Sequence, residues 1–201
     1  MRGRWMVAAL VTVLTACPML GQGIQISQAP FTGGVLTSAI TLPAGSGTAT
    51  YKPSGVIHVN TTQTGTTAVT TEETLWTYTL PANTLSANGQ SVRITIAAQS
   101  AANANAKSLR LYFGGTVIES RIGGADNATA YRIQYTVTRV SATSQLSSGW
   151  MMIAGGVDSG FIETPAETLT GNVIIKLTGQ NGTANANDLV LKSAVVEYLP
   201  Y

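Results

Sequence analysis

The stretch from Glu72 to Phe113 constrains the fold of this chain most strongly, because it reads as three successive amphipathic β-strands. In each segment apolar residues alternate with Thr or Arg, and turns rich in Asn, Gly and Ala separate the segments. A period of two is typical of antiparallel strands that bury one face. The predicted inward side chains are Trp76, Tyr78 and Leu80, then Val92, Ile94 and Ile96, then Leu109, Leu111 and Phe113.

Five further segments of strand character follow, at 116–119, 131–138, 146–154, 173–177 and 189–199. The alternation slips at Ser193–Ala194, which predicts a β-bulge in the last strand. Eight strands with turn residues at short intervals, and no helical period, predict an all-β, jelly-roll-like antiparallel β-sandwich over residues 72–201. The expected inward side chains are Tyr131, Ile133, Tyr135 and Val137, then Leu146, Ser148, Trp150, Met152 and Ala154, then Val173, Ile175 and Leu177.

One phrase recurs between strands: Ala-Asn-Ala-Asn occurs at 102–105 and again at 184–187. Asn tolerates left-handed backbone geometry and bonds its own main chain, so this composition suits turns. Two explanations are open. The two halves of a sandwich place equivalent turns at one end, or the phrase repeats by chance because turns use few residue types.

Residues 1–22 have the features of an export signal. Arg2 and Arg4 form a positive region, and the apolar run 5–16 is too short for an ordinary membrane-spanning helix. The run ends in Leu-Thr-Ala-Cys, which resembles a bacterial lipobox and makes Cys17 a candidate lipidation site. A lipid anchor at Cys17 is the one membrane contact we expect. Two alternatives are plain cleavage with secretion, and a reading frame that begins at Met19.

Residues 23–71 differ in composition from the rest of the chain: they are rich in Thr, Gly, Ser and Ala, with scattered prolines. The apolar pieces in this range are too brief to build a core of their own. We predict an extended N-terminal arm with a Thr-rich linker at its end. Any isolated strands in the arm would be ordered by its own sandwich or by other subunits.

Charge and cysteine content exclude several function classes. Arg2 and Arg4 supply two of the eleven basic residues, so the rest of the chain has nine basic and nine acidic residues. A neutral domain lacks the basic footprint of a duplex-binding protein, so no nucleic-acid partner is expected. A single cysteine permits neither an internal disulfide nor a cysteine-based zinc site.

Catalytic candidates are few. A serine hydrolase needs a base beside its nucleophile, and the one histidine, His58, lies in an apolar piece that we place outside the sandwich. Carboxylates at strand ends and in loops are normally solvated rather than paired for glycoside cleavage. We therefore predict no enzyme, no catalytic residue and no cofactor. The carboxylates considered are Glu72, Glu73, Glu119, Asp126, Asp158, Glu163, Glu167, Asp188 and Glu197.

Two Asx-rich clusters are candidates for a calcium site, Asp188 with Asn185 and Asn187, and Asp126 with Asn127. Each offers one charge and no EF-hand spacing. Turn formation explains them better, so no metal site is predicted.

Two further groups bear on ligand binding. Arg93, Arg110 and Arg132 occupy outward strand positions and would form a cationic stripe for acidic glycans if their strands were neighbours. The favoured interpretation is pairing with nearby carboxylates or lying flat over apolar surface. Trp150, with Met151 and Met152, has the composition of a sugar-stacking platform, but its alternation with Leu146 favours core packing.

Several phrases resemble a β-sandwich module found in tail-fibre and other virion structural proteins of tailed bacteriophages and prophages. They are 75–118 (LWTYTLPANTLSANGQ…LRLYFGGTVI), 131–145 (YRIQYTVTRVSATSQ), the closing VEYLPY and the upstream FTGGVLTSAITLPAG. The resemblance covers roughly residues 30 to 201 and is carried by phrases rather than functional residues. It implies a jelly-roll-like, trimeric appendage tip, decoration or receptor-contact element. The N-terminus departs from this pattern, because a virion protein assembled in the cytoplasm should carry no export signal.

Two function hypotheses follow. The first is a non-enzymatic, phage-type virion structural or adhesion module that associates with itself as a homotrimer, or with another virion protein. The alternative is an exported bacterial surface lipoprotein whose sandwich binds a glycan or another envelope component. Residues 1–22 discriminate between them, since a true signal places the chain at the cell surface and its absence places it in a virion. The ligand-binding residues are unknown at this stage.

Overall fold

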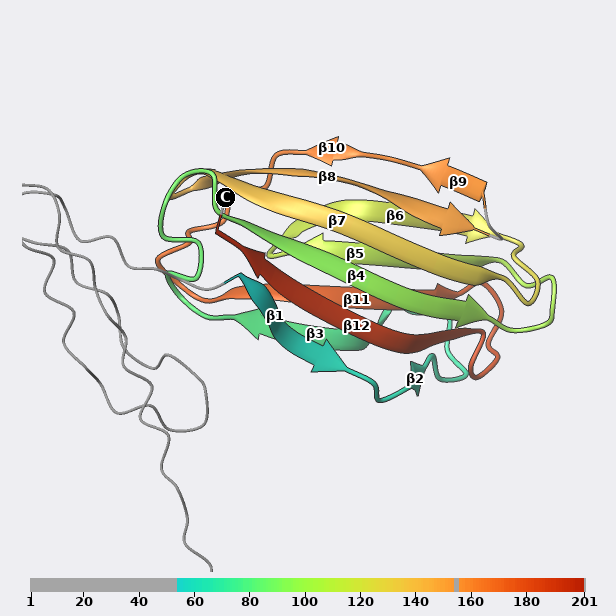
Figure 1. Ribbon diagram of the computed structural model, residues 1–201. Coiled ribbons are helices and arrows are strands. Elements are labelled where there is room, and N and C mark those ends of the chain that lie inside the picture. Colours follow the sequence, from blue (N-terminus) through green and yellow to red (C-terminus); the bar gives the residue numbers. More distant parts are fainter. Residues whose placement is uncertain (1–53, 154–155, 201) are drawn as a thin grey trace, which may run out of the picture. The chain divides into compact units, whose positions relative to one another are not determined.

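In the computed structural model, residues 54–153 and 156–200 are described, and they form twelve β-strands and no helix. The strands make two antiparallel sheets that stack face to face (Figure 1). The strands are β1 (Gly55–Asn60), β2 (Thr64–Gly65), β3 (Glu73–Leu80), β4 (Ser91–Ser100), β5 (Lys107–Phe113), β6 (Thr116–Gly124), β7 (Ala130–Ser141), β8 (Ser144–Ile153), β9 (Gly156–Ser159), β10 (Ile162–Glu163), β11 (Val173–Asn181) and β12 (Leu189–Leu199).

The large sheet has the order β1-β12-β4-β7-β8-β10, with β2 on β12 and β9 on β8, and the small sheet has the order β3-β11-β5-β6. The pairs are nested along the chain: β1 with β12, β3 with β11, β4 with β7, and β5 with β6. Successive nested pairs alternate between the two sheets, which is the wrapping of a jelly roll. Strands β8 to β10 widen the large sheet beyond this frame. The predicted all-β, jelly-roll-like sandwich is confirmed.

All eight strands predicted from the sequence are present, as β3 to β8, β11 and β12. Four further strands, β1, β2, β9 and β10, are six residues long or shorter; β1 and β2 were anticipated only as isolated strands of the arm, and β9 and β10 were not predicted. Strands β1 and β2 fall in the range 23–71 that we assigned to an arm, and they pair with β12 of their own sandwich. The placement of His58 outside the sandwich was therefore wrong. Residues 1–22 and 23–53 lie outside the described residues.

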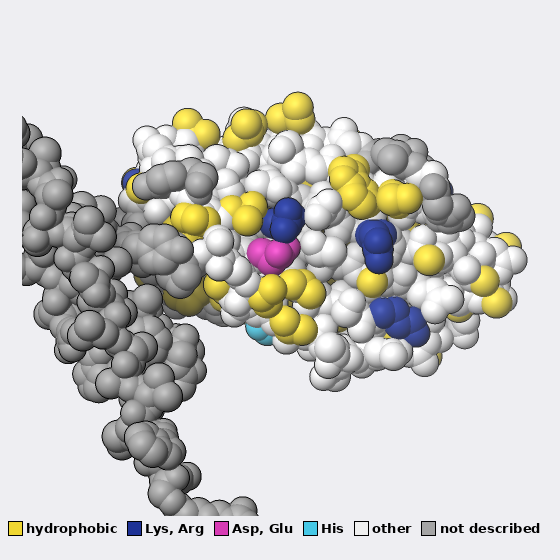
Figure 2. Space-filling view, in the orientation of Figure 1, with side chains coloured by type: hydrophobic (Ala, Val, Ile, Leu, Met, Phe, Trp, Pro, Cys, Tyr) yellow, Lys and Arg dark blue, Asp and Glu magenta, His cyan; other side chains and the backbone are white. Residues whose placement is uncertain are grey.

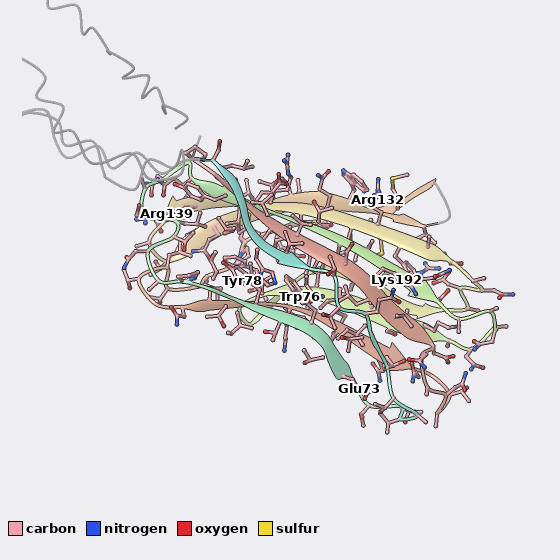
Figure 3. All side chains as sticks on the ribbon, turned by 60° about the horizontal axis from the view of Figure 1, so that its bottom comes forward. Glu73, Trp76, Tyr78, Arg132, Arg139 and Lys192 are labelled. Carbon is pink, nitrogen blue, oxygen red and sulfur yellow. The ribbon has the colours of Figure 1, made fainter. Side chains whose placement is uncertain are left out.

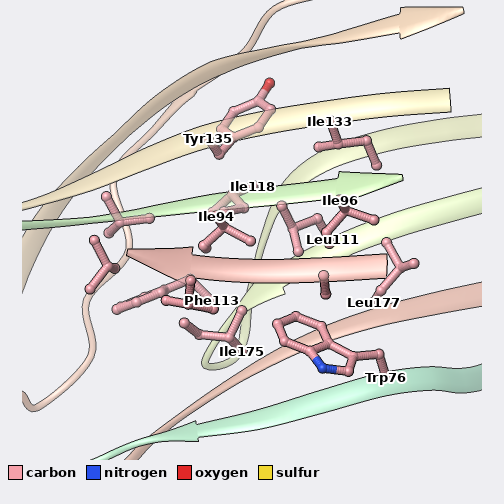
Figure 4. Close-up of a cluster of buried hydrophobic side chains, with 14 of the residues drawn as sticks. Trp76, Ile94, Ile96, Leu111, Phe113, Ile118, Ile133, Tyr135, Ile175 and Leu177 are labelled. Atoms are coloured by element: carbon pink, nitrogen blue, oxygen red, sulfur yellow. The ribbon is translucent and has the colours of Figure 1, made fainter. Parts of the chain in front are cut away.

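The core lies between the sheets and consists of inward side chains from both (Figure 4). Every inward residue predicted in β4 and β5 is buried, and so are those of β7. Burying an aliphatic or aromatic side chain of this kind stabilises the fold by about 1.5–3 kcal/mol. The fully enclosed ones include Ile94, Ile96, Leu111, Phe113, Ile118, Ile133 and Tyr135.

Strand β8 faces the opposite way to the prediction. Leu146 is 42% exposed, while Gln145, Ser147 and Met151 are buried. The Gln145 amide is satisfied inside, because it donates to the Glu167 carbonyl and accepts from the Glu167 amide, both at 2.9 Å. Gly149 also lies inward, where a Cβ would collide first with the Gln134 carbonyl oxygen and then with Tyr135.

Strand β12 contains the predicted bulge. Leu191 pairs with Ala98 and Ser193 pairs with Ala97, so Lys192 is the extra residue. The slip in alternation lets Leu191 and Ala194 both face the core.

Candidate functional site

His58 packs between the two sheets. It lies on β1, and its ring stacks on Tyr78 at 4.4 Å between centroids and on Trp76 at 5.8 Å. The Trp76 indole nitrogen donates to His58 Nε2 at 3.4 Å. Figure 3 shows Trp76 and Tyr78 reaching from β3 toward β1. These contacts close the side of the sandwich where β1 and β3 are the edge strands of their sheets.

The two Ala-Asn-Ala-Asn turns meet at one end of the sandwich. The fully buried Asp188 accepts hydrogen bonds from the amide nitrogens of Asn103 (2.7 Å) and Asn105 (3.0 Å) in the first turn and Asn185 (2.8 Å) in the second. Asn187 has φ 61°, the left-handed conformation that Asn tolerates. The first explanation of the repeated phrase, equivalent turns at one end, is therefore correct.

Lys107 is buried beside this cluster at 1% exposure. Its ammonium, with three N–H donors, lies at hydrogen-bond distance from four oxygens, at 2.8–3.1 Å: the Asn103 carbonyl, Asn103 Oδ1, the Asn105 carbonyl and the Asp126 carbonyl. Because Asn103 Oδ1 faces Lys107, the amide nitrogen of Asn103 faces Asp188. The lysine ammonium is thus enclosed in a cage of oxygen atoms.

Asp126, the acidic residue of the second cluster considered for calcium, is hydrogen-bonded to its neighbours. Arg121 contacts it at 3.1 Å and the Tyr131 hydroxyl donates to it at 2.9 Å. Burial alone would raise the pKa of Asp126, but the hydrogen bonds from Arg121 and Tyr131 outweigh it and lower that pKa. Residues 54–153 and 156–200 contain no group of three or more His, Cys, Asp or Glu able to hold a metal ion.

A carboxylate also lies inside the core. Glu119 is 1% exposed and accepts from the Ser120 amide at 2.7 Å and from the Tyr135 hydroxyl at 2.8 Å. The Tyr135 oxygen accepts in turn from the Phe161 amide at 2.9 Å. Burial raises the pKa of Tyr135, which keeps its phenol protonated as a donor. Other candidate carboxylates with structural contacts are Glu72, Glu73, Glu167 and Glu197.

The cationic stripe of all three arginines, the alternative considered from the sequence, does not form. Arg93 and Arg132 lie on the large sheet, whereas Arg110 lies on β5 in the small sheet. Arg93 forms a two-point ion pair with Glu197 at 2.8 and 3.0 Å. On the face of the molecule drawn in Figure 2, blue and magenta side chains lie side by side. Arg110 pairs with Glu72 at 3.1 Å. The favoured prediction, pairing with carboxylates, is confirmed for Arg93 and Arg110.

Trp150 lies on the outer face of the large sheet and is half-buried, so its predicted core packing is wrong. Its cross-strand partner on β7 is Gln134, and Met152 pairs with Arg132 on the same outer face. An aromatic ring beside amide and guanidinium groups has the chemistry of a surface that stacks on a sugar or a polar partner.

The outer face of the small sheet carries a polar network that sequence reasoning missed. Glu72 accepts from the Thr178 hydroxyl (2.6 Å), the Tyr112 hydroxyl (2.8 Å) and Arg110 (3.1 Å). Burial raises the pKa of Glu72, but these bonds and the charge of Lys176 outweigh it and lower the pKa. Lys176 lies over the Tyr112 ring at 4.4 Å. The period-two pattern marks these side chains as outward but cannot show that they converge.

Both edges of the large sheet expose apolar side chains. On β1, Val56 is 57% and Val59 is 55% exposed, and on β10 Ile162 is 74% exposed. An edge strand also presents unpaired backbone groups, so an apolar edge is a surface that favours strand pairing with another chain. Within residues 54–153 and 156–200, no helix is long and apolar enough to cross a membrane.

No protein-family model and no curated protein matches this chain. Among solved structures, one similar to it is the CBM2 module of an evolved Dit from Lactobacillus casei BL23 phage J-1, with 13% identity, a TM-score of 0.31, and 62% of this chain and 69% of the other covered. An infectious bursal disease virus Gt strain structure has 12% identity, a TM-score of 0.35 and coverage of 81% and 38%. The Caenorhabditis elegans galectin LEC-6 has 14% identity, a TM-score of 0.29 and coverage of 62% and 94%. Similarity at this level assigns the chain to none of these groups.

Proposed function

We propose that this chain is a non-enzymatic structural module of phage type, serving in a virion appendage such as a tail fibre or as a decoration protein. The proposal rests on one observation: the side chains that could do chemistry are engaged in holding the sandwich together. Lys107, Asp188 and Glu119 are buried in hydrogen bonds that close the fold, and His58 packs between the sheets. The surface left for partners is apolar at both edges of the large sheet.

The partner in this proposal is a second copy of the chain, in a homotrimer. A ring of three needs a head-to-tail interface in which two different patches of each copy meet. Strands β1 and β10 are two such patches, because they form opposite edges of the large sheet. Contact between them would cover Val56, Val59 and Ile162 and pair backbone groups at the edges.

Light scattering on the chain without residues 1–22 tests the proposal. We expect a trimer at micromolar concentration, reduced to monomer by Val56→Lys with Val59→Lys and, separately, by Ile162→Lys. Val140→Lys is the control, because Val140 is equally exposed but lies near the β7–β8 turn. A wild-type protein that stays monomeric throughout this range would overturn the trimer. A dimeric mass that only the β1 substitutions reduce to monomer would replace the trimer with a symmetric dimer formed through β1.

Trp150 supports a second candidate function, contact with a glycan or envelope component through the outer face of the large sheet. Its ring faces outward beside Gln134. On a glycan array, Trp150→Ala should abolish binding that the wild-type protein shows, while melting at the same temperature. Binding retained by Trp150→Ala would exclude this face.

Localisation depends on residues 1–22, which lie outside the described residues. Mass spectrometry of the protein from its native host distinguishes the two hypotheses. A triacylated Cys17 would establish the exported lipoprotein and exclude a cytoplasmic virion route. An unmodified chain that begins at Met19 would exclude lipidation.

A further inference from the structure

A depression of about 250 Å³ opens on the outer face of the small sheet, where β5, β6 and β11 lie side by side. Small residues make the space: Ser108 on β5, Gly123 on β6, and Gly182 just beyond β11. The ladder continues beneath them, since the Gly182 amide donates to the Ala106 carbonyl at 2.7 Å. Arg110, Ile122 and Gln180 form the walls.

Arg110 is held in place with donors to spare. Its Nη1 donates to Glu72 at 3.1 Å and to the Gln180 side-chain oxygen at 3.2 Å. Guanidinium has five N–H groups, and those on Nε and Nη2 make no hydrogen bond to other described residues. Glu72 is itself fixed by Tyr112 and Thr178, and Gln180 donates to the Thr70 carbonyl at 3.0 Å. The guanidinium is therefore oriented before any ligand arrives, which lowers the entropic cost of binding.

The lining offers unused donors on Arg110 and Ser108, and one acceptor, the buried Asn181 Oδ1, that has no hydrogen-bond partner among the described residues. The Ser108 oxygen already accepts from the Gly123 amide at 3.0 Å, which leaves its hydroxyl proton free to point into the depression. The Glu72 carboxylate accepts from three donors and does not line the space. With Lys176 nearby over Tyr112, the local charge is positive. Such a surface selects an oxyanion, and a planar fork of N–H groups fits a carboxylate at two points.

Ile122 indicates what the part of the ligand beyond its oxyanion is like. It is 66% exposed and forms an apolar wall beside the donors. An apolar side chain and a few polar groups in a shallow space match a ring that has one apolar face of C–H groups and one polar edge. We propose that this depression binds a sugar unit that carries a carboxylate, with the carboxylate on Arg110 and the ring against Ile122.

This inference goes beyond the proposed function, because the depression lies on the small sheet, apart from the edges β1 and β10 and from Trp150. Failure of the test below leaves self-association unaffected. Failure of the trimer likewise leaves this site intact.

Amide NMR titration of the full chain tests the site, with glucuronic acid as probe and methyl glucoside and acetate as matched controls. We expect shifts at Gly123, Gly182 and Ser108 with glucuronic acid, and affinities for both controls at least about tenfold weaker, equivalent to about 1.4 kcal/mol. Equal binding of methyl glucoside would show that the carboxylate is not recognised, and equal binding of acetate would show that the ring is not. Either result, or shifts confined to other residues, overturns the proposal.

Charge variants at the exposed wall separate binding from folding. Ile122→Glu should weaken glucuronic acid binding at least about tenfold, and Ile122→Lys should weaken it less, because both variants lose the apolar wall but only Ile122→Glu adds a negative charge beside the bound carboxylate. Arg110→Lys keeps the charge but loses the two-point fork, so it should also weaken binding. Val140→Glu is the control and should leave the affinity unchanged. Equal affinity of the two Ile122 variants would contradict the proposal.

Discussion

The middle of the sandwich and the end that carries the Ala-Asn-Ala-Asn turns are equally buried but held by different forces. In the middle, Leu111 and Ile94 contact other apolar side chains from both sheets (Figure 4). At the end, Lys107 and Asp188 are enclosed by amides and carbonyls at hydrogen-bond distance. One region excludes water by packing, and the other satisfies every charge with a directed partner.

The difference teaches how each region fails. Apolar burial is non-directional and scales with area, so a truncated side chain costs stability in proportion to what it leaves empty. A buried polar network is cooperative, because removing one member leaves its partners without donors or acceptors. The stability of the polar end should therefore depend on pH, whereas the cost of truncating an apolar side chain in the middle should not.

Removing the ammonium should have the largest effect. Lys107→Met keeps most of the volume but leaves three backbone carbonyls without their donor and removes the positive charge that favours the Asp188 carboxylate. We expect the free energy of unfolding in urea to fall by about 3–5 kcal/mol. Lys192→Met is the control, since Lys192 makes one exposed bond to Gln63. A loss from Lys107→Met no greater than the control would show that the network does not act as a unit.

Truncation in the middle should cost slightly less. Leu111→Ala removes a fully buried side chain, and we expect the free energy of unfolding to fall by about 2–5 kcal/mol. No ionisable group is created or lost, so the deficit should be the same at neutral and acidic pH. Urea unfolding at both pH values measures it. A deficit that varies strongly with pH would mean that middle and end are coupled.

Acid should weaken the end selectively and by a smaller amount. Burial would raise the pKa of Asp188, but the bonds from Asn103, Asn105 and Asn185 and the charge of Lys107 place it below its ordinary value of 3.8. The unfolded chain therefore binds the proton more readily, so this stability is present above the ordinary value and is lost as pH falls through the lowered folded pKa. The urea midpoint should decline in that window, and Asp188→Asn should lower it at neutral pH and flatten the decline. An Asp188→Asn protein with the wild-type pH profile would refute this assignment.

The sequence predicted the middle better than the end. Val92, Ile94 and Ile96 were correctly placed in the core because alternation reports which residues share a face. It does not report which of two faces is inside, and in β8 a buried Gln145 satisfied by backbone bonds reversed the expected side. The repeated turns indicated a shared end, but Lys107 carried no signal because a lysine at a strand start normally faces water.

The candidate surfaces show the same division. Outward positions of Arg93 and Arg110 were predicted, but the two side chains lie on different sheets because β4 and β5 are consecutive in sequence and not paired. Glu72 was recognised as a strand-end acid, whereas its three donors come from β5 and β11. The depression beside Arg110 depends on small residues on β5, on β6 and just after β11, which only strand pairing brings together.

By itself the sequence determined the all-β class, the eight principal strands, the β12 bulge and most of the core, since these depend on local periodicity and turn composition. Tertiary structure alone decided that β1 belongs to the jelly roll, that β8 turns Trp150 outward, and that Lys107 occupies an oxygen cage. It also decided that Arg110 overlooks a depression. These features depend on contacts between residues distant in sequence, and a period of two along one strand carries no information about which strand lies beside it.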